Sequence, residues 1–273
     1  MILNNQYNFL YFKQRRTSST SLEIALSRFC STDDIITKVN RVNRGVLGDS
    51  EGPSSQNYLD PDQPYLHGLY LKNNLNHCLY HNVKQLTKLL PFSRMLFGYK
   101  DPPELKKWMF KEENQKYTGH MSVALVRQRI GDERFDDAFK FTVVRNPFDQ
   151  ILSWYYWISA TGGKNLQMDF QTFVRIKSLE FFESNKEVFV EDNKLMVDEI
   201  LHYESLNEEL PRIGERLCLP QNLGEIHSGI KTNSFTRTTR GYELIDKQSQ
   251  EIIINSAEFF FENCGYSKDV PNP

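Results

Sequence analysis

Residues 139–153 predict a buried strand that leads directly into a helix. Residues 139–144 are apolar apart from Lys140 and Thr142, and Pro147 suits the first turn of a helix. The strand ends on Arg145, and Ser153 follows eight residues later. Such a junction places a fixed positive charge and a hydroxyl near a helix start, where an anion is favoured.

A second junction of this kind lies near the N-terminus. Residues 7–12 are apolar and aromatic enough for a strand, and Thr20 with Glu23 has the spacing of a capping box at the start of a helix. The loop between them offers guanidinium groups, hydroxyls and backbone amides to an anion: Arg15, Arg16, Thr17, Ser18, Ser19, Thr20 and Ser21. Two such junctions predict a ligand with anionic groups at both ends.

The remaining pattern alternates strands and helices. Further strands are expected at residues 35–37 and 196–203, and further helices at residues 82–90, 102–110, 122–130, 205–217 and 246–262. Residues 41–65 predict a long loop. This order indicates an α/β fold with a central, mostly parallel sheet flanked by helices in three layers, with residues 1–273 as a single domain. Ligands of such sheets bind at the carboxyl ends of the strands, where both junctions lie.

Composition narrows the classes of partner. The formal net charge of −2 argues against nucleic-acid binding, which needs a strongly basic face. The four cysteines form no close pair, so neither a zinc motif nor a redox motif is present. No apolar run reaches the roughly 18 residues of a membrane span, and a strand is expected close to Met1. We therefore expect a cytoplasmic protein without an integral membrane segment; the oligomeric state is not encoded in any recognisable pattern.

The two junctions together resemble the sulfotransferases that use 3′-phosphoadenosine 5′-phosphosulfate (PAPS), in particular the carbohydrate-type branch. The loop of residues 16–21 is similar to the family's 5′-phosphosulfate loop. Arg145, Pro147 and Ser153 match its 3′-phosphate signature. Two further segments look like the family: Trp154-Tyr155-Tyr156 and Leu201-His202-Tyr203-Glu204-Ser205-Leu206. The resemblance spans nearly the whole chain and implies a P-loop-like fold that needs no metal.

The resemblance also implies roles for individual residues. Residues 15–21 would bind the 5′-phosphosulfate, and Arg145 with Ser153 would bind the 3′-phosphate. The family usually has a lysine where this chain has Arg16. Arginine still supplies positive charge to the leaving phosphate, but it does not give up a proton. In related enzymes a late loop closes over the nucleotide, which here points to Lys231, Arg237 and Arg240, although solvated loop charge explains them equally well.

His120 is the expected general base. It lies before the 3′-phosphate strand, as the catalytic histidine does in the similar uronyl 2-O-sulfotransferases, and histidine titrates near neutrality. Without the resemblance, a helix cap or a surface position would explain it better. His77 and His81 are four residues apart but have no third ligand nearby, so they are interpreted as structural.

The sequence thus predicts an enzyme that moves a sulfuryl group from PAPS to an acceptor hydroxyl, expected to be on a carbohydrate. Three alternatives stay open. A P-loop kinase would share the design but would need magnesium and ATP. A protein that binds the nucleotide without catalysis is compatible with Arg16 in place of lysine. An interaction module on the same fold would bind neither nucleotide.

Overall fold

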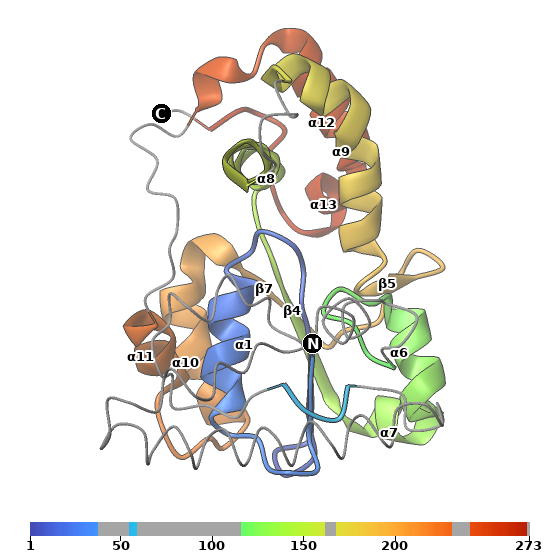
Figure 1. The fold of residues 1–273 in the computed structure, drawn as a ribbon, viewed down its shortest axis with the longest axis vertical. Coiled ribbons are helices and arrows are strands. Elements are labelled where there is room, and N and C mark those ends of the chain that lie inside the picture. Colours follow the sequence, from blue (N-terminus) through green and yellow to red (C-terminus); the bar gives the residue numbers. More distant parts are fainter. Residues whose placement is uncertain (38–54, 59–115, 162–167, 231–240, 272–273) are drawn as a thin grey trace, which may run out of the picture. The chain divides into compact units, whose positions relative to one another are not determined.

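The computed structural model describes residues 1–37, 55–58, 116–161, 168–230 and 241–271 (Figure 1). The chain divides into two compact units, one made of Met1–Asn57 and Thr118–Pro273 and the other of Tyr58–Tyr117. Nearly all of the described residues belong to the first unit. The single domain over residues 1–273 stays a prediction.

The first unit is built on a mixed, mostly parallel sheet. Its described strands are β1 (Ile2–Asn4), β2 (Phe9–Phe12), β3 (Ile35–Ile36), β4 (Phe139–Val144) and β7 (Glu199–His202), in the spatial order β3-β1-β2-β4-β7. The β2–β4 and β4–β7 pairs are parallel, whereas β1 is antiparallel to both β2 and β3. Four strands therefore run in one direction, and β2 and β4 end side by side.

Helices and a small hairpin surround this sheet. The described helices are α1 (Ser19–Ser27), α6 (Val123–Ile130), α7 (Asp132–Asp137), α8 (Pro147–Thr161), α9 (Phe170–Lys186), α10 (Leu206–Arg216), α11 (Leu223–Gly229), α12 (Lys247–Ser256) and α13 (Glu258–Asn263). Short 3₁₀ helices are η3 (Tyr203–Ser205) and η4 (Tyr242–Leu244), and β5 (Val190–Glu191) pairs with β6 (Lys194–Leu195). None of the helices in these ranges is long and apolar enough to cross a membrane.

One face of the sheet packs on α1, α10 and α11. Tyr11 and Phe141 are paired neighbours in the parallel ladder, with ring centroids 5.3 Å apart, and both are wholly buried. Leu22 of α1 and Ile213 of α10 belong to the same core. Each large apolar side chain buried in this way contributes roughly 1.5–3 kcal/mol. This packing fixes α1, and hence the loop before it, against the sheet.

The opposite face carries the alternate residues of the strands. Side chains alternate along a strand, so Phe12 points away from Tyr11 and meets Phe135 of α7, with ring centroids 6.4 Å apart. Lys140 is also buried on this face, where its Nζ donates to the carbonyls of Phe135 and Ala138 at 3.1 and 2.7 Å. The sheet is therefore covered on both faces, which explains why β2 is apolar throughout.

A second core lies among α8, α9, α12 and α13, beyond the point where β4 ends (Figure 1). Trp154 of α8 stacks on Phe181 of α9 with ring centroids 4.2 Å apart, and Phe148 packs on Phe261 of α13 at 5.4 Å. These contacts hold α8, which carries Ser153, at a fixed height above the carboxyl end of the sheet.

Most predicted elements in the described ranges are confirmed, including the two strands that precede the candidate anion loops. The prediction of one final helix over residues 246–262 is wrong, because the chain breaks at Ala257 into α12 and α13. Strand β1, the β5–β6 hairpin and helices α7, α9 and α11 were not predicted. The predicted helices at residues 82–90 and 102–110, most of the loop at 41–65, and His77, His81, Lys231, Arg237 and Arg240 lie outside the described residues.

Candidate active site

The loop of residues 13–18 joins the carboxyl end of β2 to α1. Arg16 and Ser18 adopt left-handed backbone conformations, with φ of 66° and 57°. Such residues are costly unless their surroundings hold them, and they turn successive amides toward one side of a loop, as in anion-binding nests. Ser18 occupies the N-cap position of α1 but makes no capping hydrogen bond with its side chain. Its hydroxyl therefore leaves the first-turn amides of α1 to another acceptor.

The predicted capping box of Thr20 and Glu23 is wrong. The helix begins at Ser19, so Thr20 lies inside its first turn. Glu23 is wholly buried, and its carboxylate pairs with Lys13 Nζ at 2.5 Å and with the Met1 amino group at 3.0 Å. The long-range ion pair outcompetes the local cap because Glu23 faces the sheet, where no water can solvate it.

Two helices beyond the sheet hold the backbone of Arg15 from both sides. Its N–H donates to Asn185 Oδ1 of α9 at 2.8 Å, and its carbonyl accepts from Gln150 Nε2 of α8 at 2.8 Å. Asn185 and Gln150 are wholly buried. The Arg15 guanidinium donates to Ser184 Oγ at 2.6 Å. The loop is thus fixed before any ligand arrives.

Arg16 lies in the first predicted anion loop and contacts residues of the second. Its Nε donates to Ser153 Oγ at 3.1 Å, and its guanidinium carbon lies 5.7 Å from the ring centroid of Trp157. Its carbonyl accepts from Arg145 Nη1 at 3.2 Å. The sequence predicted Arg16 and Ser153 at opposite ends of a ligand, whereas the structure places them in direct contact.

Arg145 is held in place by an aromatic ring and a carboxylate. Its guanidinium carbon lies 4.2 Å from the ring centroid of Tyr203, and Nη2 is 3.9 Å from Asp149 Oδ1. The other Asp149 oxygen accepts from the Tyr242 hydroxyl at 2.8 Å. Among the described residues, the buried Nε of Arg145 has no acceptor. An anion beside Arg145 would supply one.

The loop hydroxyls divide into inward-facing and accessible groups. Thr17 is wholly buried and donates to the Gln14 carbonyl at 3.3 Å, and Ser19 and Ser21 are buried as well. Ser18 and Thr20 keep part of their surface exposed. These two are the hydroxyls of the loop that an incoming anion can reach without a change in the fold.

His120 lies against the start of the same loop. Its Nδ1 is 2.8 Å from the Lys13 carbonyl, and because a carbonyl can only accept, Nδ1 carries the proton and donates. The pKa of His120 is lowered to about 3, first by burial and then by the positive charges of Lys13 and Arg15. The imidazole is therefore neutral, with its lone pair on Nε2. An anion bound near Lys13 and Arg15 would offset their charge and raise the pKa of His120.

The capping-box pattern assigned Glu23 the wrong role, that of a helix cap, and a second residue of this region was missed from the sequence. The pKa of Glu23 is lowered to about 2 because its cationic partners outweigh the effect of burial. A glutamate among the apolar residues of a helix was the signal that it needed a buried partner. The missed residue is His227 of α11, whose Nε2 lies 3.3 Å from Ser18 Oγ and whose pKa is lowered by burial. Its position had no signal, because it depends on the packing of α11 on α1.

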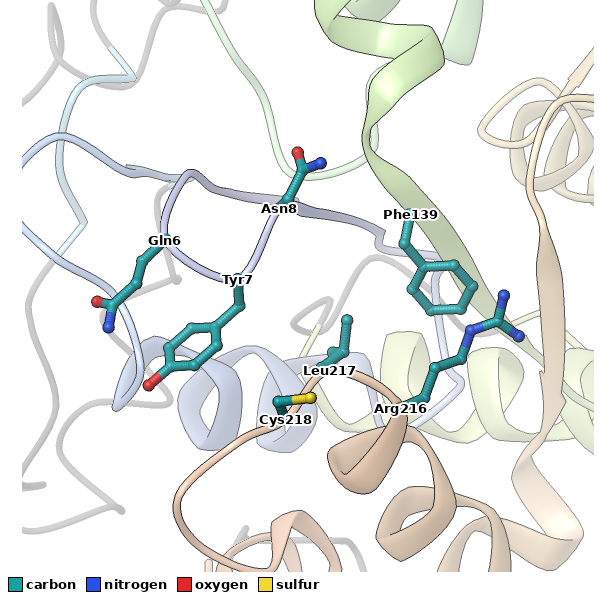
Figure 2. Close-up of a pocket in the computed structure, with 7 residues that line it drawn as sticks. All are labelled: Gln6, Tyr7, Asn8, Phe139, Arg216, Leu217 and Cys218. Atoms are coloured by element: carbon teal, nitrogen blue, oxygen red, sulfur yellow. The ribbon is translucent and has the colours of Figure 1, made fainter.

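The structure also has a hollow of about 400 Å³, lined by Gln6, Tyr7, Asn8, Phe139, Arg216, Leu217 and Cys218 (Figure 2). It lies at the opposite end of the strands, where β2 and β4 begin. In Figure 2 the Phe139 and Arg216 side chains lie beside one another, and the Arg216 guanidinium carbon is 4.1 Å from the ring centroid. None of the predicted site residues lines this hollow, so it is separate from the candidate site.

Comparison with known proteins assigns no function to this arrangement. No family model matches the chain, and no solved structure matches it. A protein of Archaeoglobus fulgidus, described only as uncharacterized, is 28% identical over 107 residues, which are 38% of this chain and 87% of that protein. The case for function therefore depends on the geometry of the site.

Proposed function

We propose that the protein is a PAPS-dependent sulfotransferase with a P-loop-like fold that acts on a hydroxyl acceptor, with a carbohydrate as the first candidate. The observation that carries this proposal is the meeting of Arg16, Arg145 and Ser153 beside the start of α1. Arg16 and Arg145 follow the ends of two adjacent parallel strands, which is where α/β sheets bind phosphorylated ligands, and Ser153 lies on α8. The cytoplasmic location and the absence of a nucleic-acid partner stay predictions from sequence.

In this proposal the 5′-phosphosulfate lies at the start of α1. The first-turn amides, Ser18 and Thr20 would donate to it, and the positive end of the helix would stabilise the charge that grows on the leaving phosphate. The 3′-phosphate would lie beside Arg145 and Ser153. The buried Nε of Arg145, which has no acceptor among the described residues, supports this placement.

Transfer would follow an in-line path. The acceptor oxygen attacks sulfur, the bond between sulfur and the 5′-phosphate oxygen breaks, and the acceptor proton passes to His120 Nε2. The hydrogen bond from Nδ1 to the Lys13 carbonyl supports this role, because it leaves the Nε2 lone pair available. No step uses a metal ion.

A second candidate, nucleotide binding with little or no transfer, is favoured by one contact. The Arg16 side chain, which replaces the lysine of the similar family, is directed to Ser153. The positive charge of Arg16 therefore lies away from the 5′-phosphate, which is the expected leaving group. Measurement of binding and of transfer must therefore be kept apart.

A thermal-shift series tests the proposed ligand. Adenosine 3′,5′-bisphosphate, the product of PAPS, is expected to raise the melting temperature by a few degrees at about 100 times its dissociation constant, a gain of roughly 2.7 kcal/mol. AMP should do so much less, because it cannot bridge the start of α1 and Arg145. A response to ATP with magnesium alone would support a kinase instead, and no response to any nucleotide would contradict the proposal.

His120→Asn is expected to lower the rate of sulfuryl transfer by about a hundredfold to ten-thousandfold. Asparagine can still donate to the Lys13 carbonyl but has no basic lone pair, so the loop should keep its conformation. Turnover with labelled donor measures the effect, and the dissociation constant of the bisphosphate serves as the control, which should stay within about twofold. Unchanged turnover would assign the base to another residue.

A further inference from the structure

Three contacts of Arg16 lead to the same side of the site. Its guanidinium reaches Ser153 and Trp157, which are four residues apart and therefore share one face of α8. Its carbonyl is held by Arg145. The left-handed backbone at Arg16, with φ of 66°, fixes the direction in which the side chain leaves the loop.

The neighbouring cations are directed elsewhere. Lys13 is buried on Glu23, and the Arg15 guanidinium donates to Ser184 of α9. Ser153 is nearly buried and accepts the hydrogen bond from Arg16, so its own proton can still be donated to an anion. An anion that accepts a hydrogen bond from Ser153 would therefore also lie beside the Arg16 guanidinium.

We propose that Arg16 is a specificity residue for the 3′-phosphate of the nucleotide and does not act on the 5′ end. This assignment rests on the proposed function and changes the role of one residue within it. A phosphate monoester carries about −1.5 to −2 charge at pH 7, which two guanidinium groups match better than one. The 5′ group is then left to the start of α1 and its hydroxyls, without a fixed cation from Arg16.

Three mononucleotide ligands separate the two ends. The dissociation constants of adenosine 3′-monophosphate, adenosine 5′-monophosphate and the 3′,5′-bisphosphate are measured by calorimetry for the wild type and for Arg16→Gln. The proposal expects Arg16→Gln to weaken the 3′-monophosphate and the bisphosphate by about tenfold, the effect of one charge-assisted hydrogen bond, and the 5′-monophosphate by less than about twofold.

Two variants serve as controls for folding and for charge. Arg134→Gln removes the same charge from an exposed arginine of α7 and should affect all three ligands by less than about twofold. Arg16→Lys keeps the charge but loses the planar fork, so it should show the same ligand pattern as Arg16→Gln with a smaller loss. This second variant gives the answer if Arg16→Gln does not fold.

The reverse pattern would overturn the assignment: loss of 5′-monophosphate and bisphosphate binding with the 3′-monophosphate unchanged would place Arg16 at the 5′ end. An equal loss for all three ligands would also overturn it, since that result indicates a general effect of charge. Failure of this assignment can be told apart from failure of the proposed function. If the proposed function is wrong, the wild type would bind none of the three nucleotides, and both proposals would be contradicted together.

Discussion

Glu23→Ala is expected to lower the free energy of unfolding by about 3–5 kcal/mol, the usual cost of leaving a buried charge without its partner. The wholly buried carboxylate of Glu23 holds Lys13 Nζ at 2.5 Å, the Met1 amino group at 3.0 Å and the Thr37 hydroxyl at 2.8 Å. Without it, Lys13 would be stranded in the core. Urea unfolding followed by circular dichroism measures the loss.

Two variants sharpen this prediction. Glu251→Ala removes an exposed glutamate from α12 and should change stability by less than about 0.5 kcal/mol. Replacing the pair together, as Lys13→Met with Glu23→Leu, should recover part of the loss, because it removes the Lys13 charge, whereas the Met1 amino group still loses its carboxylate partner. A Glu23→Ala protein as stable as the wild type would show that the pair does not form.

Acid should act on this region through two groups in different pH windows. The pKa of Glu23 is lowered from 4.5 to about 2, so its stabilisation is fully present above about pH 4.5 and is lost as the pH falls toward 2. The pKa of His120 is lowered from 6.5 to about 3. Between pH 6.5 and about 3, His120 is protonated in the unfolded chain but not in the folded protein. The free energy of unfolding therefore falls on acidification from about pH 6.5. Both effects have the same sign.

Arg145→Ala is expected to remove most of the preference for a 3′-phosphorylated nucleotide. A guanidinium that holds a phosphate with two charge-assisted hydrogen bonds contributes about 3–4 kcal/mol, so affinity for the bisphosphate should fall several hundredfold. Affinity for AMP should change little. Calorimetry with the bisphosphate and AMP measures the ratio of the two dissociation constants.

The controls for Arg145 separate recognition from net charge and from folding. Arg134→Ala removes an exposed arginine of α7 and should leave both affinities unchanged. Arg145→Lys keeps the charge but loses the stacking on Tyr203 and the fork, so it should retain part of the preference. If Arg145→Ala folds like the wild type and still prefers the bisphosphate, the 3′-phosphate binds elsewhere.

Local patterns predicted the elements that carry the site. The apolar run before Arg145 gave β4, and Pro147 marked the first turn of α8. The residues before the basic loop gave β2, and the alternation of strands and helices placed both loops at the same edge of a parallel sheet. These inferences succeed because burial periodicity and turn chemistry act over a few residues of chain.

Capping was predicted less well. Ser205 occupies the N-cap position of α10, but its hydroxyl donates to Glu209 and does not cap the helix. Thr20 and Glu23 matched a capping box by spacing, yet Glu23 is drawn into the core by Lys13. A capping-box pattern considers only residues close together in the sequence, whereas a buried carboxylate pairs with the nearest cation in the folded structure, which can lie far away along the chain.

By itself, the sequence determined two strand ends that are followed by cationic and hydroxyl side chains, and their order along the chain. Only the tertiary structure decided which partner each cation contacts: Lys13 pairs with Glu23, Arg15 donates to Ser184, and Arg16 donates to Ser153. The last two partners lie well over 100 residues away along the chain, on helices that the second hydrophobic core positions. Hydrophobic patterning specifies which faces are buried, but contacts between distant polar groups depend on the packing of whole helices, which has no local signature.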